Sequence, residues 1–145
     1  MAAAEPSGLR RRQWVRPPGK GGVVILVSAD EVYLRRYLGG VLVSALLAGM
    51  RLHVNCISPS KDTAAMLDTL AIRFRGLVSF STEEPTLPDA ESRPYFAASR
   101  FCCARELIQQ YGCAVHMVDI DSIVMRPLEI PAADYGLFLR SSDNA

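Results

Sequence analysis

The chain has 145 residues, of which 50% are hydrophobic and 21% are charged, and its net charge is +1. These values exclude a wholly disordered chain and are sufficient for one domain with a real hydrophobic core. The nearly neutral charge gives no reason to expect nucleic acid or an anionic membrane as the main partner.

The first twenty residues are the most basic part of the chain. They lack the periodic hydrophobic pattern of a core-forming element, so we expect residues 1–20 to form a disordered basic tail before an α/β domain over residues 21–145. Deleting the tail should then leave the melting temperature nearly unchanged, unless Trp14 or Val15 docks into the core. The basic residues are Arg10, Arg11, Arg12, Arg16 and Lys20.

Strand and helix patterns alternate after the tail. The β-branched run Val23–Val27 predicts a central strand, and the three-four spacing of apolar residues from Glu31 to Gly49 predicts a helix. The alternation predicts an α/β fold with a mostly parallel, Rossmann-like sheet and helices on both faces. The later strands are expected at 52–56, 77–80, 112–121 and 135–139, with a short helix at about 62–71 and a loop at 83–92. A longer helix is expected at 92–111, and its predicted buried face consists of Phe96, Phe101, Ala104, Leu107 and Ile108.

The apolar run Gly112–Asp121 ends in two carboxylates, Asp119 and Asp121. Such a run predicts a buried strand, and ligands bind at the carboxyl ends of strands in open α/β sheets. Two carboxylates held there repel each other unless a cation or a set of hydrogen-bond donors neutralises them, so a divalent metal ion is the simplest expectation.

The cysteines show no paired CxxC spacing, which favours reduced core residues of an intracellular protein over a metal site. No stretch predicts a signal peptide or a transmembrane helix, and we therefore expect a cytoplasmic location. The four cysteines are Cys56, Cys102, Cys103 and Cys113.

Two stretches resemble the paired signatures of nucleotide-diphospho-sugar transferases with the glycosyltransferase A-type fold. They are Ser28–Leu34, after the first strand, and the segment from Ala98 to the Asp-x-Asp motif at Asp119–Asp121. The chain is most similar to glycogenin-like and bacterial lipopolysaccharide glycosyltransferases, over about residues 22–140. This resemblance covers only the N-terminal, nucleotide-binding half of such enzymes.

The resemblance implies a Mn²⁺ or Mg²⁺ ion on the diphosphate of the sugar donor. Asp121 matches the main metal ligand, and Asp119 matches the residue that shares contacts with the metal and the ribose. Arg100 matches an arginine that faces the phosphates or the sugar of the donor. Oxygen ligands suit these hard cations, and a guanidinium suits a phosphate.

The resemblance also implies that Ser28, Asp30 and Tyr33 surround the base and ribose of a uridine nucleotide. Because the strands at 23–27 and 112–121 should be parallel neighbours, we expect the turn Ser28–Tyr33 and the carboxylate of Asp121 to face one pocket.

The implied ligands have structural alternatives that the sequence leaves open. The two acids of the Asp-x-Asp motif can cap loop amides, and Arg100 can form a salt bridge, including one to Asp119 or Asp121. Asp30 can cap the helix that begins at Glu31, and Tyr33 can serve only in packing. His53 and His116 are expected to be structural rather than metal ligands.

These observations predict the donor-binding half of a metal-dependent glycosyltransferase that moves a hexosyl group from a UDP-sugar-like donor to a glycan, lipid or protein acceptor. Related transferases have a second half with the acceptor site and a late histidine ligand, and the sequence ends before it. The chain is therefore expected to be a fragment or a degenerate domain. The alternative function is a non-catalytic nucleotide-binding or protein-interaction module on the same scaffold.

Overall fold

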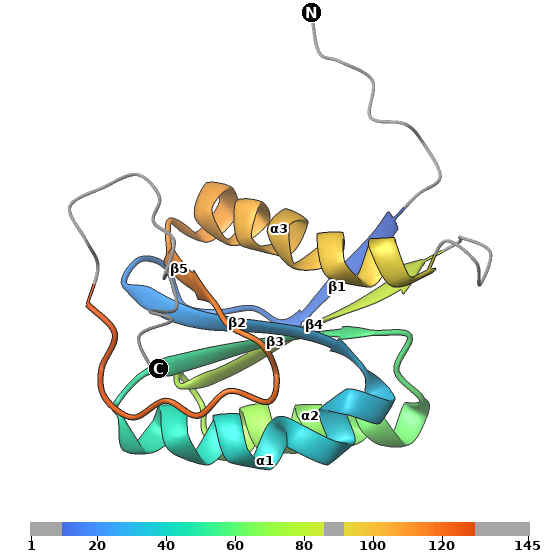
Figure 1. Ribbon diagram of the computed structural model, residues 1–145. Coiled ribbons are helices and arrows are strands. Elements are labelled where there is room, and N and C mark those ends of the chain that lie inside the picture. Colours follow the sequence, from blue (N-terminus) through green and yellow to red (C-terminus); the bar gives the residue numbers. More distant parts are fainter. Residues whose placement is uncertain (1–9, 86–91, 130–145) are drawn as a thin grey trace, which may run out of the picture.

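The computed structural model describes residues 10–85 and 92–129 as three layers, with one sheet between α3 on one side and α1 and α2 on the other (Figure 1). The sheet has five strands in the order β1-β4-β3-β2-β5. The elements are β1 (Arg10–Arg16), β2 (Val23–Asp30), α1 (Glu31–Leu47), β3 (Arg51–Ile57), α2 (Lys61–Arg73), β4 (Val78–Pro85), α3 (Ser92–Tyr111) and β5 (Ala114–Met117).

Four of the strands are parallel. β3 pairs with β2 and with β4, while β5 pairs with the other edge of β2 in the register Val23↔Ala114. β1 alone runs antiparallel, against β4, and brings Arg12 opposite Glu83. The predicted α/β fold, with a mostly parallel sheet and helices on both faces, is confirmed at this level.

One face of the sheet is apolar and carries the main core. Alternate residues of the central strands point toward α1 and α2, as the period of a strand requires. Ile120 and Val124, which follow β5, join this core, and the Val124 amide donates to the Ser44 hydroxyl at 2.9 Å. The chain after β5 is thereby attached to α1. The core includes Ile25, Val27, Ala29, Leu34, Leu38, Val41, Leu52, Val54, Leu67 and Phe80.

The opposite face is only partly apolar. Val24 and Leu26 of β2 pack against Cys103, Ala104 and Leu107 of α3. Toward β3, β4 and β1 the same face buries polar and charged side chains instead, namely Arg12, His53, Asn55, Ser79, Ser81 and Glu83.

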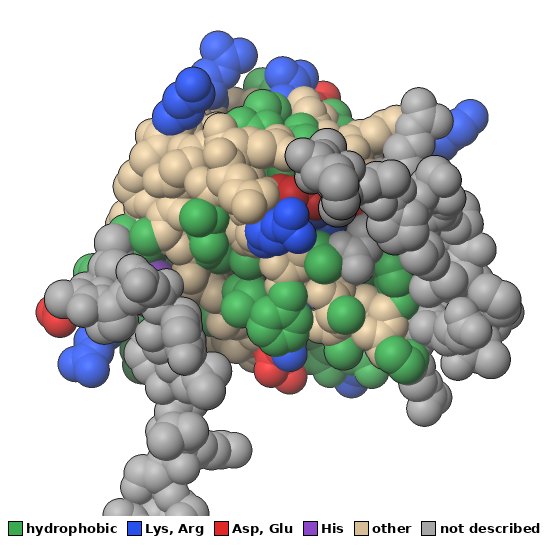
Figure 2. All heavy atoms as spheres, turned by 90° about the horizontal axis from the view of Figure 1, so that it is seen from above, with side chains coloured by type: hydrophobic (Ala, Val, Ile, Leu, Met, Phe, Trp, Pro, Cys, Tyr) green, Lys and Arg blue, Asp and Glu red, His purple; other side chains and the backbone are tan. Residues whose placement is uncertain are grey.

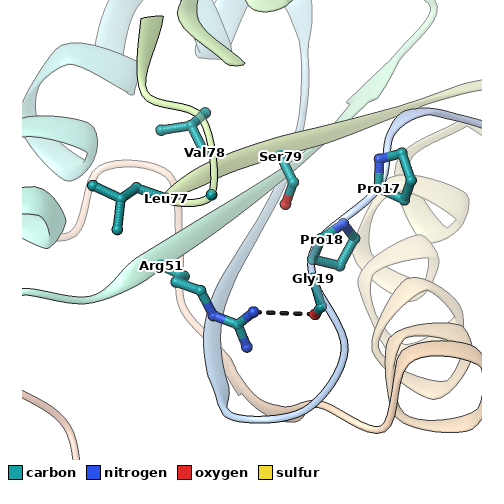
Figure 3. Close-up of a pocket in the computed structure, with 8 residues that line it drawn as sticks. Pro17, Pro18, Gly19, Arg51, Leu77, Val78 and Ser79 are labelled. Atoms are coloured by element: carbon teal, nitrogen blue, oxygen red, sulfur yellow. Dashed lines mark hydrogen bonds between the residues drawn. The ribbon is translucent and has the colours of Figure 1, made fainter. Parts of the chain in front are cut away.

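Arg51 fixes the connection between β1 and β2. Its guanidinium donates to the carbonyl oxygens of Gly19 (3.1 Å), Val23 (3.2 Å) and Gly21. Figure 3 shows the bond to Gly19 beside a small cavity of about 30 Å³ that Pro17 and Pro18 also line. Gly21 and Gly22 have positive φ angles of 71° and 67°, which L side chains rarely adopt, so the reversal of the chain requires glycine here.

The prediction of a disordered tail is wrong for residues 10–16, which form β1; residues 1–9 lie outside the described residues. Trp14 packs against His53 and Tyr111, with ring centroids 5.2 and 5.0 Å apart. The run of arginines indicated a solvated segment, but the buried Glu83 balances Arg12 and allows its burial.

Other predicted boundaries also differ. β4 extends to Pro85, so the start of the expected loop at 83–92 is strand, and residues 86–91 lie outside the described residues. The expected buried strand at 112–121 is β5, which covers only residues 114–117, is half-exposed and has no neighbour on its outer side among the described residues. The expected strand at 135–139 lies outside the described residues as well.

The predicted buried face of α3 is wrong in part. Phe101 and Ile108 are more than half exposed, and Figure 2, which looks onto the α3 side, shows hydrophobic side chains on this face with most Lys and Arg side chains near its margins. The buried stripe has a spacing of four and consists of Tyr95, Ser99, Cys103 and Leu107. Tyr95 and Ser99 can face the sheet because the sheet surface beneath them is polar. Hydrophobic periodicity cannot identify such a stripe.

Among the helices of the described residues, none combines the length and the hydrophobicity needed to cross a membrane.

The packing of β1 predicts that Trp14→Ala lowers the free energy of unfolding by about 2 kcal/mol, because the substitution removes a ring that packs at the edge of the core. Urea titration followed by circular dichroism measures this loss. Val15→Ala is the matched control, since Val15 is 43% exposed on the same strand and should change stability by less than about 0.5 kcal/mol. Equal effects of the two substitutions would contradict the docking of β1 through Trp14.

Candidate functional site

A pocket lies where the chain changes direction across the sheet. From β2 the chain passes through α1 to β3 on one side, whereas α3, on the opposite face, leads to β5 on the other side of β2 (Figure 1). Ligands of open α/β sheets bind at such a switch point, beyond the carboxyl ends of the strands. The pocket here has a volume of about 310 Å³ and is lined by Ser28, Ala29, Asp30, Tyr33, Phe96, Asp119, Ile120 and Asp121.

The predicted geometry of the site is therefore confirmed. β2 and β5 are parallel neighbours, and the turn Ser28–Tyr33 faces the same pocket as Asp121. Five of the six predicted site residues line this pocket. Arg100 does not, but it contacts the pocket residue Asp119.

The turn after β2 combines structural and exposed groups. Asp30 is the N-cap of α1 and accepts a hydrogen bond from the Tyr33 amide at 3.0 Å, so its structural alternative is observed. Tyr33 is 57% exposed, and its ring stacks on Tyr37 with centroids 6.1 Å apart. Tyr33 is therefore a partly exposed aromatic residue in the pocket lining.

The two acids lie on a short turn after β5. The Ser122 amide donates to the Asp119 carbonyl at 3.0 Å, and Ile120 between the acids is buried in the main core. This anchor leaves the carboxylates at the surface, where the Asp119 side chain is 73% exposed. Within the described residues, the carboxylate of Asp121 has no hydrogen-bond or ion-pair partner.

Arg100 holds Asp119 in an ion pair, with Nη1 and Oδ1 2.6 Å apart. The salt-bridge alternative for Arg100 is thus observed. The Arg100 Nε atom is buried and lacks a hydrogen-bond partner among the described residues, while the guanidinium lies 5.6 Å from the Phe101 ring centroid.

The described residues contain no cluster of three or more His, Cys, Asp or Glu side chains that could hold a metal ion. Three carboxylates line this pocket, those of Asp30, Asp119 and Asp121, and the last two lie together on the turn after β5. Mg²⁺ commonly binds through one or two carboxylates together with substrate phosphates and water, so the pair fits a metal that arrives with a diphosphate.

A buried polar network connects the pocket to the far edge of the sheet. Asn55 donates to Ser28 (3.0 Å) and to Glu83 (2.9 Å) and accepts from Ser81 (2.9 Å). Arg12 bonds to Asn55, Glu83 and Glu106. Ser28 also bonds to Ser99 of α3 at 3.1 Å.

His53 belongs to this network and is structural, as predicted. Its two ring nitrogens bond to the hydroxyls of Ser79 (2.8 Å) and Ser81 (3.0 Å). Burial, and secondly the charge of Arg12, lowers the pKa of His53 to about 3, so the ring is neutral at neutral pH. Burial likewise raises the pKa of the Cys56 and Cys103 thiols to about 12, which makes both thiols unreactive.

Sequence reasoning missed Phe96 as a pocket residue and the polar network beneath α3. Phe96 could not be separated from the core positions of α3 by periodicity. Asn55 and Ser79 did carry a signal, because two polar residues inside predicted strands of a covered sheet need partners.

Comparison with family models, with curated proteins and with solved structures gives no match for this chain. The assignment of a function therefore depends on the site itself.

The shift of His53 predicts a stability that falls in mild acid. Its pKa is lower in the folded chain than its unfolded value of about 6.5, so the unfolded state takes up a proton first as the pH falls. Between about pH 6 and pH 4.5, His53 should remove about 1.4 kcal/mol of unfolding free energy per pH unit. Urea titrations at several pH values measure this slope.

His53→Asn should reduce the dependence of the unfolding free energy on pH, whatever stability the substitution removes at neutral pH. His116→Asn is the control, because the pKa of His116 is lowered by partial burial and it should carry a smaller part of the slope. An unchanged slope in His53→Asn would show that His53 does not stay neutral in the folded state.

Proposed function

We propose that this chain is the donor-binding half of a metal-dependent glycosyltransferase, and that the pocket between β2 and β5 binds a UDP-sugar-like donor. The observation that carries the proposal is the meeting of the Ser28–Tyr33 turn and the Asp119–Asp121 turn in one pocket at the switch point. The residues that carry the resemblance to glycogenin-like and lipopolysaccharide glycosyltransferases are distant in sequence, and this pocket unites them.

The charges of the pocket support a requirement for metal. Asp30, Asp119 and Asp121 contribute three carboxylates, and the nearby cation Arg100 is already paired with one of them. A diphosphate would be repelled by such a surface unless a cation lay between them. Asp119 and Asp121 would hold Mn²⁺ or Mg²⁺, which supplies charge stabilisation for the leaving diphosphate.

The aromatic groups support a planar ligand. Tyr33 and Phe96 line the pocket from different elements, α1 and α3, and aromatic side chains are suited to stacking with a base. One oxygen of Asp30 caps α1, and the other, which has no partner among the described residues, would accept from a polar group of the base or the ribose.

The ion pair of Arg100 and Asp119 does not obstruct this role. Exposed pairs contribute only about 0–1 kcal/mol, so a metal ion and a diphosphate can separate the two groups at little cost. Arg100 is then available to the phosphates, for which its planar fork is well suited.

The alternative is a non-catalytic nucleotide-binding or protein-interaction module. It is favoured by the same ion pair, which satisfies Asp119 without a metal. It is also favoured by the lack, within residues 10–85 and 92–129, of a cluster of three or more side chains that could hold a metal ion. Under either function the free cysteines of the described chain support a reducing, cytoplasmic location.

The proposal predicts the behaviour of Asp121→Asn. Calorimetry with UDP should show binding that requires Mn²⁺ in the unmodified chain, and the affinity should fall at least about tenfold in the variant because a charged metal ligand is lost. Stability should change by less than about 0.5 kcal/mol, since the Asp121 carboxylate has no partner among the described residues.

Glu84→Gln is the matched control, because it removes one negative charge from an exposed position of β4 that does not line the pocket. It should leave both the affinity and the stability unchanged. UDP binding that is absent, or equally strong without Mn²⁺, would reject the donor site and favour the non-catalytic module.

A further inference from the structure

The buried stripe of α3 changes character along its length. In the C-terminal half, Cys103 and Leu107 belong to the apolar cluster with Val24 and Leu26. In the N-terminal half, Tyr95 and Ser99 are buried but belong to neither hydrophobic cluster. The half of α3 that lines the pocket is therefore held to the sheet in a different way from the rest of the helix.

Among the described residues, two side-chain hydrogen bonds join this N-terminal half to the sheet. The Tyr95 hydroxyl donates to Glu83 Oε1, and the Ser99 hydroxyl lies 3.1 Å from that of Ser28. Asn55 connects the two sheet partners, because its amide nitrogen donates to both Ser28 and Glu83. We call these five residues, Ser28, Asn55, Glu83, Tyr95 and Ser99, the polar latch.

The orientation of Asn55 is determined by its other neighbours. Arg12 Nε and the Ser81 hydroxyl both donate to its Oδ1 atom, at 3.2 and 2.9 Å. The amide oxygen thus faces β1 and β4, and both amide hydrogens are directed to the latch. Hydrogen bonds are directional, and they are stronger in a buried site than in water, so the latch defines one position for the first turns of α3.

We propose that the polar latch sets the position of the pocket wall formed by α3, which makes Asn55, Tyr95 and Ser99 positioning residues of the site. Phe96, which lines the pocket, directly follows Tyr95, and Arg100, which holds Asp119, directly follows Ser99. Each latch bond therefore fixes the neighbour of a group that faces the ligand region. The latch is a property of the fold, while its effect on a nucleotide ligand rests on the proposed function.

The test is the double variant Tyr95→Phe/Ser99→Ala in the full chain. It removes both helix-side hydroxyls, while Glu83 keeps Arg12 and Asn55 as partners and Ser28 keeps Asn55. Hydrogen exchange read out by NMR should become at least about tenfold faster at the amides of residues 96–100 and should change little at residues 104–111. The single variant Ser99→Ala should show the same pattern more weakly. It replaces the double variant in this measurement if the double variant does not fold.

Glu106→Gln is the matched control, because it weakens a polar contact between α3 and Arg12 beyond the latch. Its effect on exchange should not be confined to residues 96–100. If the latch variant changes exchange uniformly along α3, or not at all, the latch does not position the pocket wall.

Binding supplies the second measurement. The affinity for UDP with Mn²⁺ should fall about tenfold in the latch variant and stay unchanged in Glu106→Gln, since a displaced wall weakens an oriented contact. Faster local exchange with unchanged affinity would overturn the positioning role. If the unmodified chain does not bind UDP, the proposed function fails, and the exchange measurement alone decides the latch.

Discussion

The buried guanidinium of Arg12 is the interaction on which the polar side of this molecule depends. It lies 2.8 Å from Glu83 and 2.5 Å from Glu106, and its side chain is 3% exposed. Burial by itself lowers the pKa of Arg12, but the acidic groups around it raise that pKa by more, so the group stays charged. Breaking a buried pair of this kind leaves an uncompensated charge and costs about 3–5 kcal/mol. The pairing of Arg12 with Glu83 and Glu106 therefore fixes how β1, β4 and α3 pack together.

This arrangement gives the two faces of the sheet different physical roles. The face covered by α1 and α2 is packed with aliphatic side chains, and it includes Ile120 and so positions the acidic turn after β5. The face under α3 is held by hydrogen bonds that Arg12 and Asn55 orient. The pocket lies at the boundary of the two. Its acids flank Ile120 of the apolar core, whereas Ser28 and Phe96 belong to the hydrogen-bonded half.

The chemistry of the pocket follows from that placement. Its carboxylates are exposed because Ile120 between them is anchored in the core, and the pairing of Asp119 with Arg100 is weak because both groups reach solvent. A site of this kind is open to a metal ion that arrives with an anionic ligand. A closed, all-protein metal site would require further ligands, and the described residues contain no such cluster.

The sequence alone determined the alternation of strands and helices, because hydrophobic periodicity and caps such as Asp30 act locally. It also determined that the Ser28–Tyr33 turn and Asp119–Asp121 meet, because the handedness of parallel crossovers leaves few arrangements. The burial of the Arg12 side chain and the packing of Trp14 were decided only by the tertiary structure, since a run of arginines looks solvated until a buried acid from β4 is placed opposite it. The same holds for α3, whose buried stripe contains Tyr95 and Ser99 in place of Phe101 and Ile108 because the sheet beneath it is polar. Charge and hydrogen-bond partners that are distant in the chain leave no periodic pattern, so only the fold could bring them together.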